Sequence, residues 1–486
     1  MLNKIDKLKQ ALNRGTLSPD GAWVFSGCAV LFGATLDVGV FYLLTGSGVA
    51  LGAANMVSFL TAAVLFYVIK ARNTPLKAYV TVILMALFLR GGVLACFIQI
   101  WDWSAWTAIL IAAFASYLIV YLGLARFVFF PAMRGPLSTE QWRALSLGLL
   151  GYAVLLRVVY LGLPELLHEE AYYWNYAQHL DIGYLDHPPL VGWIVWLFTS
   201  VMGHTELAVR CGAFAIWIVG AFYVYRLTWR IFDKTAATGA VLIFATLPVY
   251  FCLGFVMLPD SPLVACWAGA LYYLYRLLID ERKGAWFGVG VFMGLGMLAK
   301  YTIVLLGGAG LLFVLMDGRS RRWLLRPEPY LALLIAIILF LPVIFWNAQN
   351  EWASLVFQGP RRLAGDFDFD LPDLIGSALI LLTPMGVLAV AAVAASKRFF
   401  TVSGDMTDQM RNARGYWLLM TLTFFPFGVF LVFSLFRNIK LNWTGPLWLG
   451  TVSYLGYLAV QKLPQQSGKL LLWAKRSLKA TLVIIP

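Results

Sequence analysis

Apolar runs of about 20 residues recur along the whole chain, and polar segments separate them. A helix rises about 1.5 Å per residue, so one run can cross the hydrocarbon core of a bilayer, about 30 Å thick. The two pieces beside Lys300 are short for upright spans and could be half-length helices that meet near the outer face. The pattern predicts an all-α polytopic membrane protein. The expected spans are 22–46, 49–69, 78–100, 105–125, 144–163, 207–227, 236–256, 262–279, 285–299, 301–316, 329–346, 373–395, 415–435 and 444–461, and a further one could begin near 477.

Composition supports membrane insertion. Hydrophobic residues make up 61% of the 486 residues and charged residues 13%, whereas soluble domains carry about 25% charged residues. The 22 tyrosines and 19 tryptophans fit rings at membrane interfaces. The net charge of +13 is spread between apolar runs, so we interpret it as a topology signal and expect no nucleic-acid partner. The five cysteines include no CxxC pair and are interpreted as small buried hydrophobes.

The basic residues are distributed unevenly between the two sides of the predicted topology. With the N-terminus in the cytoplasm, most of the 37 basic residues fall in cytoplasmic segments, the bias that normally sets orientation. We therefore expect a cytoplasmic N-terminus. The basic residues elsewhere are Arg90, Arg157, Arg210, Lys300, Arg361, Arg362, Arg437 and Lys440.

The outer side of this topology has two longer loops, at about 164–206 and 347–372. The first contains all four histidines and a group of acidic residues, and loops on a rigid scaffold often carry the chemistry of a protein. We expect an outward-facing active site there. The histidines are too irregularly spaced for a compact zinc motif. They are His168, His179, His187 and His204.

Two modules are expected on either side of a polar, proline-containing stretch. We divide the chain into a four-span unit at 1–130, a cytoplasmic linker at 131–144 and a larger membrane unit at 145–486. Asp37 and Arg90 are ionisable groups inside spans of the first unit, where an isolated charge costs about 2.5–3.5 kcal/mol. They could form a structural ion pair between helices, or a polar spot contacted by a lipid headgroup.

The first unit resembles the GtrA-like family of small four-span proteins. The resemblance covers about 22–130, and FSGCAVLFGATLDVGVFYLL is its clearest part. It implies a role in moving polyprenyl-phosphate sugars across the membrane, or in assisting the enzymes that use them.

The most informative stretch is HEEAYYWNYAQHLDIGYLDHPPL, at 168–190. Glu169 and Glu170 follow a predicted span directly and would meet a lipid-linked substrate at the interface. One carboxylate could accept a proton from an acceptor group while the other orients the acceptor. The pair could also bind a divalent cation that neutralises a phosphate leaving group. Alternatively, the two glutamates are solvated residues at a helix start, AYYW is an interfacial anchor and DHPP is a rigid turn.

This stretch closely resembles the corresponding loop of bacterial glycosyltransferase family 39, whose members have the GT-C membrane fold. The family pattern is an acidic pair, then AYYW, then GY-x-DHPPL, and Glu169-Glu170 stands where Asp-Glu is commoner. Further matches follow in order at 206–210, 258–262, 294–302, 342–347 and 436–443, so the resemblance covers about 145–460. Glycosyltransferase family 39 includes protein O-mannosyltransferases and the transferase that adds aminoarabinose to lipid A.

The resemblance implies an inverting glycosyltransferase of the bacterial inner membrane, with a polyprenyl-phosphate sugar as donor and an active site on the periplasmic side. Glu169 or Glu170 would act as the base. Lys300, Arg437 and Lys440 would bind the donor phosphate; Lys300 could instead be a lysine that snorkels to the interface. The expected substrate-binding residues are Tyr172, Tyr173, Tyr184, Asp186, His187, Asp260 and Asn442.

Several alternatives stay open at this point. The acceptor could be lipid A, another glycolipid, a polysaccharide or a protein, and a separate cytoplasmic synthase is expected to make the donor. The chief alternative function is a polyprenyl-phosphate-sugar flippase without glycosyl transfer, because intramembrane charges are typical of transporters. A scaffold that recruits such a synthase is a second alternative. The final residues 480–486 are apolar, so the C-terminus could be truncated.

Overall fold

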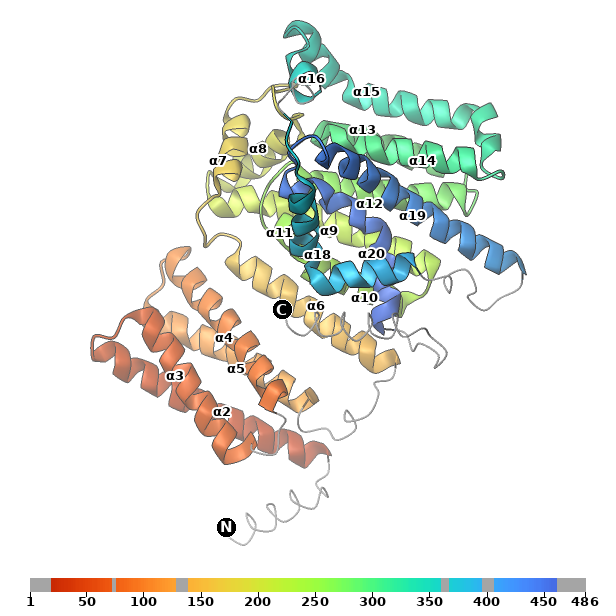
Figure 1. The fold of residues 1–486 in the computed structure, drawn as a ribbon. Helices are drawn as coiled ribbons and strands as arrows, with labels where there is room; N and C mark the ends of the chain where they lie inside the picture. The colour runs from red at the N-terminus through yellow and green to blue at the C-terminus, as the bar shows by residue number, and fades with distance from the viewer. Residues whose placement is uncertain (1–18, 72–75, 128–138, 360–366, 396–405, 461–486) are drawn as a thin grey trace. The chain divides into compact units, whose positions relative to one another are not determined.

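The computed structural model describes residues 19–71, 76–127, 139–359, 367–395 and 406–460 (Figure 1). Within them every regular element is helical, which confirms the expected all-α class. The elements are α2 (Pro19–Gly46), α3 (Leu51–Phe66), η1 (Tyr67–Ala71), α4 (Leu76–Gln99), α5 (Ala105–Phe127), α6 (Thr139–Tyr160), α7 (His168–Gln178), α8 (Leu190–Met202), α9 (Glu206–Ile231), α10 (Lys234–Thr246), α11 (Pro248–Leu253), α12 (Asp260–Leu278), α13 (Ala285–Ala299), η3 (Tyr301–Ile303), α14 (Val304–Met316), η4 (Arg321–Leu325), α15 (Pro327–Gln349), α16 (Ala353–Gln358), α18 (Leu371–Ala394), α19 (Met406–Ser434), η6 (Leu441–Trp448) and α20 (Leu449–Val460).

The helices agree closely with the predicted spans. Seven helices of the described residues are long and apolar enough to cross a bilayer, and shorter apolar helices accompany them. The expected break at Lys300 is present, because its backbone is extended (φ −161°, ψ 135°) between α13 and η3. The expected span at 236–256 is divided between α10 and α11, where Pro248 begins the second helix. The predicted span near 477, and most of the predicted linker, lie outside the described residues.

The expected outer loop at 164–206 differs most from its prediction. It contains two helices, α7 and α8, joined by an irregular segment. The second, LVGWIVWLFTSVM, is strongly apolar but only 13 residues long. This is too short for a span, so the hydrophobic pattern alone predicts a loop there. Tyr173 and Tyr176 of α7 pack with Val191 and Val195 of α8 in a small core. These helices therefore form a compact layer rather than an open loop.

The chain divides into two compact units, 1–138 with 155–164, and 139–154 with 165–486. The first unit packs α2, α3, α4 and α5 together. Its buried ion pair joins Arg90 to Asp37, with Nη1–Oδ2 and Nη2–Oδ1 distances of 2.5 and 3.1 Å. Arg90 also donates from Nε to Asn55 at 2.7 Å. These contacts favour the structural ion pair over the headgroup site, because all three side chains are buried.

The second unit is a helical bundle whose core is built by α9, α10, α12, α19 and α20. Small residues let the backbones approach closely there, as is common in membrane helices. A Cβ atom on Gly456 of α20 would lie only 2.5 Å from the backbone nitrogen of Ala240 of α10. Figure 1 shows α13 and α15 side by side, and α12 packs on α13. In this bundle the non-helical segments before α12, after α13 and before η6 lie close together.

Candidate active site

A cavity of about 820 Å³ lies where these segments meet. Residues of α7, of the α13–α14 junction, of α19 and of the segment before α20 form its wall. Its apolar side is formed by Val429, Phe430 and Phe433 of the long helix α19, so a lipid chain could lie against it. The residues of the predicted site that line it are Glu169, Tyr173, His187, Asp260, Lys300, Lys440 and Asn442.

Lys300 is paired inside this cavity. Its Nζ lies 2.9 Å from both carboxylate oxygens of Asp260, and Asn442 Nδ2 donates to Asp260 Oδ2 at 2.7 Å. The lysine is nearly buried and the aspartate is buried. The geometry therefore joins three residues that were predicted separately, and the charge of Lys300 is balanced by that of Asp260.

Local sequence explains how these side chains are presented. Asp260 begins α12 between two prolines, Pro259 and Pro262, and proline suits the first turn of a helix because its missing N–H is not needed there. Lys300 ends α13 in an extended conformation, which turns its side chain out of the helical register. Both residues therefore occupy helix ends, where a side chain can reach into a cavity.

Glu170 is held by a different set of contacts. Arg210 donates to it from Nε at 3.0 Å and from Nη2 at 2.8 Å. The backbone nitrogens of Leu167 and Met257 donate to its Oε2 and Oε1 at 3.0 and 3.1 Å. The bond from Leu167 is the helix-capping contact of a glutamate at the third position of α7. Glu170 is fully buried and accepts four hydrogen bonds, so it fits a positioning role and does not fit the expected role of a base.

Glu169 lies on the cavity side of α7. It is exposed and lines the cavity, and within the described residues it takes part in no ion pair. Lys440 is also exposed, lines the same cavity and makes no ion pair with any described residue. The cavity thus contains a carboxylate and a cation that are both available to a ligand.

Tyr173 completes this side of the cavity. Burial raises the pKa of its hydroxyl, and the nearby carboxylates of Asp186 and Asp260 raise it further. The phenol therefore stays protonated at neutral pH and can donate a hydrogen bond to a ligand. His187 lies beside it, with ring centroids 5.9 Å apart.

The other predicted site residues lie outside the lining. Tyr172 donates to Asp186 at 3.1 Å, and Tyr176 also donates to this carboxylate. Tyr184 stacks on Tyr176 with ring centroids 3.7 Å apart. These residues support the wall behind Tyr173. Arg437 donates to the carbonyl of Phe436 at 3.3 Å and does not line the cavity.

Three residues at the site carried no predicted role. Arg210 holds Glu170, as described above. Asp370, which is buried, accepts from Asn438 Nδ2 at 3.3 Å and from the backbone nitrogen of Ile439 at 2.5 Å, and so fixes the segment that presents Lys440. Gln358 lines the cavity and donates to the carbonyl of Asp186. The available signals were the position of Arg210 near the start of the predicted span 207–227 and that of Asp370 just before the predicted span 373–395.

The described residues contain no group of three or more His, Cys, Asp or Glu side chains suited to a metal ion. Glu169 and Glu170 were expected to share a divalent cation. The two point to different surroundings, because Glu170 already accepts from Arg210 and two backbone N–H groups. The joint role therefore does not fit the geometry of the pair.

Comparison with known proteins shows which enzymes this chain is similar to. The family model described as "Dolichyl-phosphate-mannose-protein mannosyltransferase" matches residues 186–346. A lipid A galacturonosyltransferase of Rhizobium johnstonii is 26% identical over 186 residues, 38% of this chain and 38% of that protein. An undecaprenyl phosphate-alpha-4-amino-4-deoxy-L-arabinose arabinosyl transferase of Proteus mirabilis is 28% identical over 140 residues, 27% of this chain and 25% of that protein.

A solved structure shares the fold. The crystal structure of ArnT from Cupriavidus metallidurans bound to undecaprenyl phosphate matches with a TM-score of 0.53 at 15% identity, over 69% of this chain and 63% of that chain. The first curated relatives are matched over 38% to 56% of their own length. These findings confirm the expected GT-C membrane fold, and they show that part of the chain is similar to transferases of this group. The GtrA-like resemblance of the first unit stays a prediction.

Proposed function

From this relationship at residues 186–346 and the shared GT-C fold, we propose that the protein transfers a sugar from a polyprenyl-phosphate donor to an acceptor at a membrane surface. The observation that carries the proposal is that one cavity contains a carboxylate, a cation and an apolar wall. A carboxylate, Glu169, and a cation, Lys440, line the same space beside the apolar residues of α19. A transferase of this kind needs a base for the acceptor, a cation for the phosphate and an apolar path for the lipid.

Glu169 acts as the base in this proposal. It takes the proton of the acceptor group as that group forms a bond to the anomeric carbon. The bond between the anomeric carbon and the phosphate oxygen breaks, and its electron pair leaves on the polyprenyl phosphate. Attack from the side opposite the leaving group inverts the anomeric carbon.

Lys440 and Lys300 stabilise the negative charge that gathers on the phosphate. Such preorganised charge is usually the largest single contribution to catalysis. Lys440 meets the phosphate directly. Lys300 remains oriented by Asp260, whose carboxylate also accepts a hydrogen bond from Asn442. Tyr173 donates a hydrogen bond to the sugar or the phosphate, because its phenol is protonated.

The names of the relatives suggest the substrate classes. Two Rhizobium johnstonii relatives are named for lipid A or the lipopolysaccharide core, and the Proteus mirabilis relative is named for an undecaprenyl phosphate-linked sugar. We infer a lipid-linked glycan as acceptor and the inner membrane as the location, with the cavity on the periplasmic side and the N-terminus in the cytoplasm. A separate cytoplasmic enzyme then makes the donor.

The test compares Glu169→Gln with Glu170→Gln in purified protein reconstituted in lipid vesicles. Radiolabelled undecaprenyl-phosphate sugars are the donors, and an envelope lipid extract supplies the acceptor. We expect the Glu169→Gln variant to lose about 10²–10⁴-fold in transfer rate with its fold intact. The Glu170→Gln variant loses thermal stability as well, because Arg210 then keeps a buried charge without a counterion.

Two results would contradict the proposal. The first is full transfer by the Glu169→Gln variant. The second is label that crosses the bilayer of the vesicles while it stays attached to the polyprenyl phosphate, which would indicate a flippase.

A further inference from the structure

A second cavity lies between α13, α14 and α15. Its volume is about 450 Å³, within the range of pockets that hold small ligands. The described residues that line it are apolar residues and glycine. Among the described residues, only Val304 lines both this cavity and the candidate active site. The second cavity is therefore a separate, apolar space.

The length of this cavity matches one leaflet of a membrane. It follows α15 from Pro329 to Phe340, which at about 1.5 Å per residue is about 17 Å, close to half of the hydrocarbon thickness of about 30 Å. Leu311, Leu333 and Ile337 in its lining are also exposed on the helix surfaces. A single acyl chain of one leaflet fits this length and could enter sideways from the bilayer.

One end of the cavity meets a group of arginines. Trp323, which lines the cavity, has the guanidinium carbons of Arg322 and Arg326 at 5.6 and 5.7 Å from a ring centroid. Within the described residues only Glu281 and Glu328 form ion pairs with the group, so positive charges exceed negative charges by two. The group consists of Arg319, Arg321, Arg322 and Arg326.

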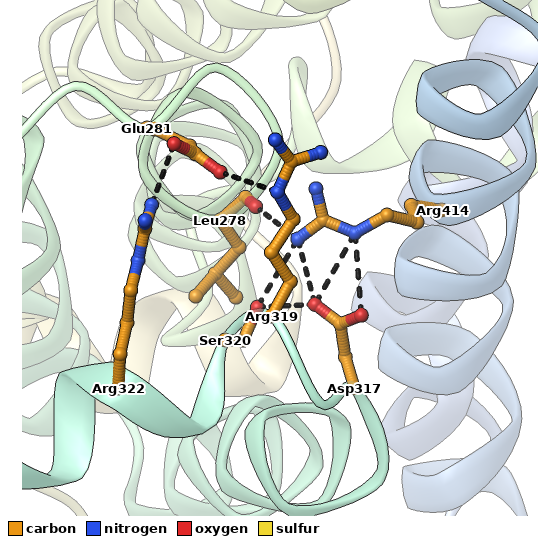
Figure 2. Close-up of polar contacts among 7 residues, drawn as sticks. All are labelled: Leu278, Glu281, Asp317, Arg319, Ser320, Arg322 and Arg414. Carbon is orange, nitrogen blue, oxygen red and sulfur yellow. Dashed lines mark hydrogen bonds and ion pairs between the residues drawn. The ribbon is translucent and has the colours of Figure 1, made fainter. Parts of the chain in front are cut away.

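A fixed network holds two of these arginines in place (Figure 2). Arg322 Nη2 lies 2.6 Å and Arg319 Nε 3.3 Å from the carboxylate of Glu281. The hydrogen bond from Arg322 lowers the pKa of Glu281, which therefore stays ionised at neutral pH. Nearby, Arg414 pairs with Asp317 at 2.6 Å and ties this segment to α19.

The two arginines keep capacity for a further anion. Arg319 contacts Glu281 through Nε, so its terminal amino groups remain for another acceptor. The side chains of Arg319 and Arg322 are 59% and 46% exposed. A lipid phosphate at this end could reach both, and arginine is well suited to bind a phosphate with two parallel hydrogen bonds.

A buried donor at the same end also lacks an acceptor. The indole nitrogen of Trp286, which lines the cavity, is buried and has no hydrogen-bond partner among the described residues. An indole N–H usually finds an acceptor when buried, and tryptophan is common at membrane interfaces. A phosphate or ester oxygen of a lipid would supply that acceptor.

We propose that this cavity binds one anionic phospholipid of the leaflet that this end of the bundle faces. Its acyl chain lies between α13, α14 and α15, and its phosphate lies on Arg319 and Arg322. The site is at the end of α14 opposite Val304, and therefore opposite the candidate active site. It concerns lipid binding alone, so it does not depend on the proposed transfer.

The experiment uses the purified full chain, stripped of lipid in detergent. Phosphatidylglycerol and phosphatidylcholine with identical chains are titrated, and native mass spectrometry counts the bound lipid while the unfolding temperature is recorded. We expect one phosphatidylglycerol per chain to bind and to raise the unfolding temperature. The Arg319→Gln/Arg322→Gln variant binds it about 30-fold more weakly, and the control Lys234→Gln, an exposed cation on α10, binds it normally.

A second variant separates the cavity from the charges. Gly307→Leu fills the cavity and leaves the arginines intact, because a Cβ at Gly307 meets only the flexible end of Met293, at 3.1 Å. We expect it to remain folded and to lose the bound phospholipid. Equal binding of both phospholipids, or unchanged binding by both variants, would overturn the proposal. So would undecaprenyl phosphate that displaces the phospholipid and needs Lys300, because the cavity would then belong to the donor.

Discussion

The Lys300–Asp260 pair allows the sharpest test of the site, through the substitution Lys300→Met. The side chains of Lys300 and Asp260 are 9% and 1% exposed, so the substitution would leave a carboxylate with little access to water. Among the described residues, Asp260 would then keep the hydrogen bond from Asn442 alone. Removing one partner of a buried ion pair costs about 3–5 kcal/mol, because the other charge is left uncompensated. We expect a loss of stability of this order.

A double-mutant cycle measures the pair itself. Asp260→Asn keeps an acceptor for Asn442, and the Lys300→Met/Asp260→Asn protein contains neither charge. We expect the double variant to be more stable than either single variant, with a coupling near the upper end of the range of about 0.5–3 kcal/mol seen for residues in contact. Unfolding in mixed micelles provides the free energies, and Lys234→Met, an exposed lysine on α10, is the control.

Activity then separates the two interpretations of Lys300. If Lys300 only balances Asp260, the double variant regains transfer together with stability. If Lys300 also stabilises the phosphate, the double variant regains stability and remains slow. A loss below about 1 kcal/mol for Lys300→Met, in the range of exposed ion pairs, would refute the structural reasoning, and so would a coupling close to zero.

Three further predictions concern other parts of the protein. Arg90→Leu should destabilise the first unit by about 3–5 kcal/mol, because it leaves Asp37 buried without its partner; an unfolding midpoint equal to that of the parent protein would contradict this. Gly456→Leu should prevent α20 from packing on α10, because even a Cβ would lie 2.5 Å from a backbone nitrogen, and we expect little folded protein in size-exclusion chromatography. The pKa of Glu281 is lowered from 4.5 by its hydrogen bond with Arg322. The ionised form is thus favoured by folding, and this stability is lost as the pH falls below about 4.5; unfolding scans of Glu281→Gln should lack that part of the pH dependence.

The sequence was sufficient for the membrane-spanning architecture. Hydrophobic runs long enough to cross a bilayer are visible without any contact information, because every span must present apolar side chains and bond its own backbone. The break at Lys300 was also predictable, since the apolar pieces on either side are short. The short apolar helix α8 was missed, because its 13 residues satisfy the composition of a span but not its length.

The candidate site was predictable in its residues but not in their roles. The motif at 168–190 identified Glu169 and Glu170 as an acidic pair, but the sequence alone does not distinguish the roles of two adjacent glutamates. A helix turns by about 100° per residue, so adjacent side chains face different surroundings. Only the tertiary packing of α7, α8 and α9 in one small core brings Arg210 to Glu170 and leaves Glu169 facing the cavity.

Tertiary structure alone decided which distant residues meet. Lys300 lies 40 residues after Asp260, and Asn442 lies 142 residues after Lys300. The carboxylate of Asp260 nevertheless accepts hydrogen bonds from both side chains. Hydrophobic patterning fixes each span separately and contains no information on the lateral order of helices in the bilayer. That order follows from close packing of small residues such as Gly456 against Ala240, because lipid and apolar side chains are equally hydrophobic and packing must supply the preference.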